Sequence, residues 1–98
     1  MITTTGSFAS PKASGYLQQL CKHFAHKIAV EFDANSGRAE MGFGRFEAKA
    51  GPDRMTVQLW ITDPAQLDQA RHVIDKHLAI FAHREGFERL DWSAPVAA

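Results

Sequence analysis

Polar and apolar positions alternate at the start of the chain and then change to a helical period. Ile2 and Phe8 fall on one face of an extended segment, and three β-branched threonines between them favour a short strand. Ser10-Pro11 predicts a helix start, because serine can cap free amides and proline is tolerated at the first helical position. Apolar residues then recur every three or four positions as one buried stripe, namely Ala13, Tyr16, Leu17, Leu20, Cys21 and Phe24.

A period of two returns near His26 and predicts four consecutive strands. The turn chemistry of residues 34–37, Ala-Asn-Ser-Gly, separates the first two strands, since Asn and Gly can take positive φ. Gly42-Phe43-Gly44 then predicts a bulge, a tight corner or a close backbone approach. The apolar positions of the four strands are Ile28, Val30 and Phe32; Ala39, Met41 and Phe43; Phe46, Ala48 and Ala50; and Met55, Val57, Leu59 and Ile61.

A second, longer helix follows the strands. Asp63-Pro64 predicts its capped start, and Gly86 predicts its stop just after Arg84-Glu85. Its apolar stripe includes His77, which we interpret as a histidine at the edge of the core or as a ligand-facing one. Leu90 and Trp92 alternate with polar residues and are compatible with a short final strand, and residues 93–98 are expected to form a loose tail.

This element order predicts the α+β class. Consecutive strands with short turns imply an antiparallel meander, and the two helices are the only elements available to cover its apolar face. We therefore expect a curved antiparallel sheet in β-α-β4-α order, which resembles the TBP-like and helix-grip folds. The 98 residues suit a single domain spanning 1–98, with an ordered core of about residues 2–92.

Composition narrows the classes of partner. Eleven basic and eleven acidic residues leave no net charge, which gives no argument for nucleic acid or an anionic membrane. Residues 1–30 hold three lysines and no acid, so positive charge is concentrated near the first helix. No signal peptide or membrane-spanning apolar run is evident, and a single cysteine fits a reducing compartment. A cytoplasmic protein is expected.

The first helix carries the candidate chemistry. Cys21, His23 and His26 form a C-x-H-x-x-H pattern whose side chains can bind zinc or iron, although Cys21 and His23 lie on different faces of a continuous helix. The alternatives are a buried structural cysteine beside ordinary helix-end histidines, or a redox or nucleophilic thiol. No other cofactor is expected.

Two further features indicate binding. Lys22, His23, His26 and Lys27 form a basic group that could receive an anion or an acidic partner, or could simply be solvated. Trp60, on the polar face of its strand, marks either an interface or a position covered by another element. No nucleophile elbow, H-E-x-x-H or C-x-x-C motif occurs, so we assign no catalytic residues and favour a non-enzymatic role.

Three blocks carry a family resemblance: YLQQLCKHFAHKIAVEF, the glycine-flanked GFG, and HLAIFAHRE followed by a terminal Asp-Trp. Together they resemble a family of small bacterial proteins designated domain of unknown function 2218, from about Thr4 to Trp92. The resemblance implies a cytoplasmic location and, for some members, an iron-acquisition context beside siderophore-interacting flavin reductases. It implies no established catalytic residues.

Three hypotheses of function follow. The first is an accessory protein that binds an anionic ligand, such as a siderophore, or a siderophore-interacting reductase through Lys22–Lys27, with Trp60 as a further ligand-binding candidate. The second is a metal-binding protein that uses Cys21, His23 and His26. The third is a homodimer joined through the sheet edge or the Trp60 face.

Overall fold

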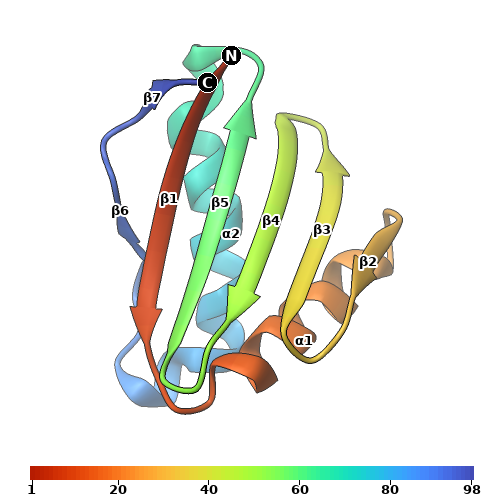
Figure 1. The fold of residues 1–98 in the computed structure, drawn as a ribbon, viewed down its shortest axis with the longest axis vertical. Coiled ribbons are helices and arrows are strands. Elements are labelled where there is room, and N and C mark those ends of the chain that lie inside the picture. Colours follow the sequence, from red (N-terminus) through yellow and green to blue (C-terminus); the bar gives the residue numbers. More distant parts are fainter.

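The computed structural model describes residues 1–98 as one antiparallel sheet with both helices on the same face (Figure 1). The strands run in the order β2-β3-β4-β5-β1-β6, and β7 also pairs with β1. The predicted α+β class and β-α-β4-α order are therefore confirmed. The elements are β1 (Ile2–Ala9), α1 (Ala13–Ala25), β2 (Val30–Phe32), β3 (Ser36–Met41), β4 (Gly44–Ala50), β5 (Arg54–Ile61), η1 (Pro64–Gln66), α2 (Leu67–Ala82), η2 (His83–Glu85), β6 (Asp91–Trp92) and β7 (Val96–Ala97).

The core lies between the sheet and the helices. Alternate residues of β5, from Met55 to Ile61, are fully buried, as the period of two predicts. The α1 stripe meets them across the interface, and all six of its predicted members are buried. From α2 the core receives Ala70, Ile74, Leu78 and Ala82. This continuous cluster holds both helices against the sheet.

The N-terminus of α1 differs from the prediction. The helix begins at Ala13, two residues after the predicted first position at Pro11. Ser10 does not cap it: the Ser10 hydroxyl accepts a hydrogen bond from the Lys12 amide at 3.0 Å and donates to the Glu85 carboxylate. Ser10 therefore organises a turn ahead of α1 and ties that turn to η2.

The turns between strands follow two different rules. Asp33, rather than Asn35 or Gly37, makes the β2–β3 turn, because its carboxylate accepts the amides of Asn35 and Ser36 at 2.8 and 2.9 Å. These bonds hold the pKa of Asp33 below its ordinary value.

At the β3–β4 corner, Gly44 has a φ of 144°, and a Cβ there would lie 2.0 Å from the Trp60 carbonyl oxygen. The predicted corner is thus a close backbone approach as well.

The second helix begins and ends at the predicted signals. The Asp63 carboxylate accepts the Ala65 amide at 3.0 Å, with Pro64 in the first position. Gly86 ends the helical segment in the left-handed region, with a φ of 76°. The first and last turns are 3-10 segments, η1 and η2, which flank the α-helical part.

The C-terminal segment corrects the prediction of a loose tail. The Ser93 amide donates to the Thr5 carbonyl at 2.7 Å, and Val96 and Ala97 pair with Thr3 and Ile2 as β7. The segment thus covers the outer edge of β1, and the two termini lie side by side (Figure 1). Pairing with this segment gives partners to backbone groups that an unpaired β1 edge would leave without them, and the same hydrogen bonds order the segment.

Candidate functional site

Cys21 is a core residue. Its side chain is fully buried, and a Cβ placed on Gly37 of β3 would lie 2.5 Å from its sulfur. The thiol therefore fills the space that a glycine leaves in the facing strand. Burial raises the pKa of the Cys21 thiol to about 11, so it stays protonated at neutral pH.

The predicted C-x-H-x-x-H group does not come together. Cys21 points into the core, whereas His23 is half-buried against α2, and His26 is exposed beyond the end of α1. No group of three or more His, Cys, Asp or Glu side chains is placed to hold a metal ion. Side-chain direction on a helix separates Cys21 from His23, as the 100° step per residue indicates.

The basic group is also divided. Lys22 lines a groove between α1 and the end of α2, with an approximate volume of 880 Å³. His26 and Lys27 are exposed at the end of α1 and do not line this groove. The predicted basic surface from Lys22 to Lys27 is therefore not one continuous site.

The groove itself gathers basic residues that are remote in sequence. Lys12 and Lys22 come from the α1 side, and His83 and Arg84 come from η2. Ile80, which is 54% exposed, and Phe81 provide its apolar wall. Gly15 lies between the two lysines, and a Cβ there would meet nothing within 4 Å, so the α1 wall is open at that point.

One acid shares the groove, and it is already bonded. The Glu85 carboxylate accepts hydrogen bonds from the hydroxyls of Tyr16 and Ser10. The bond to Glu85, together with burial and the negative charge, raises the pKa of Tyr16 above its ordinary value. Because both hydroxyls come from the segment around the start of α1, Glu85 fixes η2 against that helix and sets the geometry of the groove.

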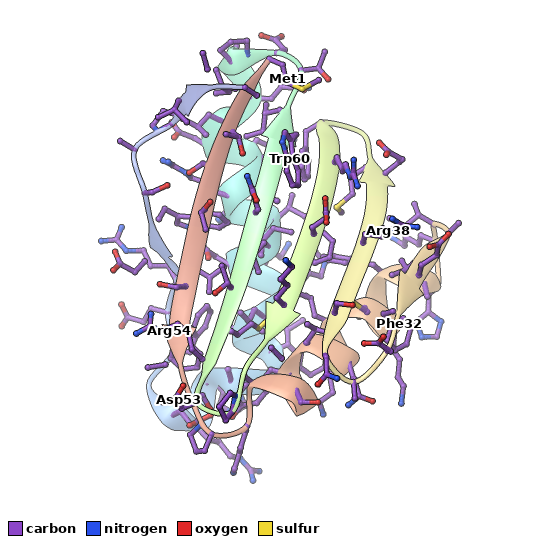
Figure 2. The ribbon with its side chains drawn as sticks, viewed as in Figure 1. Met1, Phe32, Arg38, Asp53, Arg54 and Trp60 are labelled. Atoms are coloured by element: carbon purple, nitrogen blue, oxygen red, sulfur yellow. The ribbon has the colours of Figure 1, made fainter.

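Trp60 lies on the opposite side of the molecule. Figure 2 shows it on the outer face of the sheet, away from the helices, and its ring is half-buried. The Arg45 guanidinium lies over the ring, 5.3 Å from its centroid, and pairs with Glu47 at 3.0 Å. Neither a helix nor the final strand covers Trp60. Because Trp60 and Lys22 lie on opposite sides of the molecule, they cannot contact the same ligand.

Sequence reasoning missed Lys12, Arg84 and Gly15 as members of a site. Lys12 and Lys22 are ten positions apart, close to three helical turns, and this spacing could have placed them on one face. The approach of Arg84 depends on how α2 packs against α1, and no local pattern encodes that packing. No helix is both long and apolar enough to cross a membrane.

The chain is similar to known bacterial proteins over nearly its whole length. A solved NMR structure, PA4090 from Pseudomonas aeruginosa, is 30% identical and has a TM-score of 0.76, covering 95% of this chain and 96% of that one. None of the curated proteins matches this chain. The profile of a family described as "Uncharacterized protein conserved in bacteria (DUF2218)" matches residues 5–93, and the chain belongs to that family.

Proposed function

We propose that this chain is a binding protein that takes an organic anion in the groove between α1 and α2. The observation that carries the proposal is the convergence of Lys12, Lys22 and Arg84 on one concavity with an apolar wall. Concave sites with a few placed charges and apolar lining are the usual form of small-molecule sites. Lysine and arginine supply charge-assisted hydrogen bonds to carboxylate or phosphate groups.

Gly15 supports the same reading. A glycine inside an exposed helix costs about 1 kcal/mol relative to alanine. Packing does not require glycine at position 15, because a Cβ there would have open space around it. A position without a side chain lets a ligand approach the helix backbone closely, and Gly15 lies in the groove wall between the cations.

The geometry predicts modest affinity. The cations are exposed, so each contact with an anion is weakened by water and salt, at about 1 kcal/mol or less. Burial of the apolar wall by the ligand adds to the binding free energy. The total corresponds to dissociation constants of about 1 μM to 1 mM. Affinity is expected to fall with ionic strength, since its charged part is screened.

The test is a titration with 8-anilinonaphthalene-1-sulfonate, which combines an anionic group with an aromatic body. Lys22→Glu and Arg84→Glu should each weaken binding about tenfold. Lys49→Glu is the matched control, because Lys49 is an exposed lysine on β4 outside the groove. Equal binding by all four proteins, at unchanged unfolding midpoints, would exclude the groove as the anion site.

The family context suggests which anions to try first. Ferric siderophores present anionic oxygen donors, and a siderophore-interacting reductase is the partner that the family resemblance implies. We propose these as the ligand and the partner to test, by competition against the sulfonate probe and by co-purification. Failure of every ferric siderophore to displace the probe would remove the iron context and leave the anion site standing.

Homodimerisation is a separate proposal supported by two uncovered features. The strand β2 ends the sheet order and leaves one of its edges unpaired, and the Trp60 face carries no covering element. A symmetric pair could form through either surface. Light scattering that returns the monomer mass at high protein concentration would contradict it.

A further inference from the structure

His23 and His77 meet across the helix interface, beyond the apolar wall of the groove. Their ring centroids are 4.8 Å apart, with the planes inclined by 47°. Both rings are half-buried, with Phe81 beside His23 and Phe24 beside His77. The pair thus joins α1 to α2 in a partly water-accessible position.

This separation fits two imidazoles that share one metal ion. A nitrogen about 2.1 Å from a metal places its ring centroid about 3.2 Å from that metal. For ligand angles between square and tetrahedral, the two centroids then lie about 4.5–5.2 Å apart. The observed centroid distance of 4.8 Å falls inside this range.

The hydrogen bonds leave nitrogen lone pairs available. Nδ1 of His77 lies 2.6 Å from the Val73 carbonyl oxygen and so donates its proton to it. In the neutral form of the ring this leaves the lone pair on Nε2, and a backbone carbonyl behind the ring is the usual support for a metal-ligating histidine. Neither ring nitrogen of His23 is engaged by another protein group in a hydrogen bond.

Two basic side chains near His23, those of His26 and Lys27, oppose a dication. Both are exposed and screened by solvent, which limits their effect.

We propose that His23 and His77 form a two-imidazole site for a divalent transition metal. Two protein ligands leave the remaining coordination positions to water or to an exogenous anion, so the site is open. Imidazole nitrogen suits zinc, copper and nickel. The site differs from the C-x-H-x-x-H pattern, because it replaces Cys21 and His26 with a histidine from the facing helix.

The test is calorimetric titration of the untagged protein with zinc chloride at neutral pH, with histidine side-chain NMR to locate the metal. We expect one saturable site that shifts the resonances of His23 and His77. His23→Gln and His77→Gln should each weaken binding about tenfold or more, since one imidazole is lost. Far-UV circular dichroism checks that both variants fold. If His77→Gln does not fold, the His23→Gln variant carries the test.

Two control variants separate this site from its alternatives. His72→Gln removes an exposed histidine on α2, and Cys21→Ala removes the core thiol. Both should bind zinc as the wild type does. The proposal is overturned if the wild type shows no saturable binding, or if His26→Gln abolishes binding while His77→Gln leaves it unchanged.

Discussion

At the residue scale, Cys21 and Gly37 form a complementary pair. The sulfur occupies the space above a strand position that has no side chain, and a Cβ there would come within 2.5 Å of it. The same packing keeps the thiol away from water and raises its pKa to about 11. Cys21 is therefore a packing residue, and its chemistry is suppressed by its surroundings.

Exchange of Gly37 for alanine should destabilise the protein by about 1–3 kcal/mol, because the new methyl group overlaps the Cys21 sulfur. Urea unfolding of Gly37→Ala measures this loss. The double variant Gly37→Ala with Cys21→Ala should recover part of it, since the smaller side chain makes room. Strictly additive effects of the two substitutions would show that the residues do not compete for this space.

The Cys21 thiol should react slowly with a disulfide reagent at pH 8 in the folded protein and rapidly after unfolding in urea. Its folded pKa lies above the ordinary 9.0, so its contribution to stability is complete below about pH 9. That contribution is lost as the pH rises from 9.0 to about 11, when the unfolded chain ionises first. The free energy of unfolding of Cys21→Ala should fall less over this interval. Fast labelling of the folded protein at pH 8 would contradict the account.

At the element scale, the hydrophobic period, together with the cap and turn residues, predicted the class and order of the elements. The α1 stripe and the alternation in β5 fix which faces are buried, and these signals are local. Three features escaped because they depend on distant partners. Ser10 donates a hydrogen bond to Glu85, 75 positions away, and the residues after Ser93 pair with β1. Arg84 lines one groove with Lys22 only because α2 packs against α1.

The β3–β4 corner requires glycine at one position only. Gly44→Ala should cost more than about 2 kcal/mol, because its φ is positive and a Cβ would collide with the Trp60 carbonyl. Gly42→Ala in the same corner is the control: its Cβ would meet nothing within 4 Å, and its φ is not positive. Thermal unfolding of the two variants compares them, and similar losses would contradict the close approach at Gly44.

Asp75 holds the C-terminal segment against α2. Its carboxylate accepts the Leu90 amide and the Trp92 indole, both at 2.9 Å. Asp75→Ala should cost about 1–3 kcal/mol and speed hydrogen exchange in β6 and β7. Lys76→Ala, an exposed neighbour, should change neither quantity. Unchanged exchange at residues 91–97 in Asp75→Ala would show that β1 alone retains the segment.

At the scale of the whole molecule, the two faces have different characters. The helical face carries the groove with its three nearby cations and the His23–His77 pair. The outer sheet face carries Trp60 under Arg45, which pairs with Glu47 at 3.0 Å. The net charge of zero thus conceals a local excess of positive charge at the groove, which is where an anion would bind.

Chemical-shift mapping of the backbone amides during titration with 8-anilinonaphthalene-1-sulfonate tests the proposed site most directly. The account predicts saturable shifts clustered at Gly15, Gln19 and Lys22 on α1 and at Ile80 and Arg84 opposite them. The outer strand positions around Trp60 should stay unshifted. Shifts centred on Trp60 and Arg45, with the groove amides unmoved, would contradict the account and transfer the binding function to the open face of the sheet.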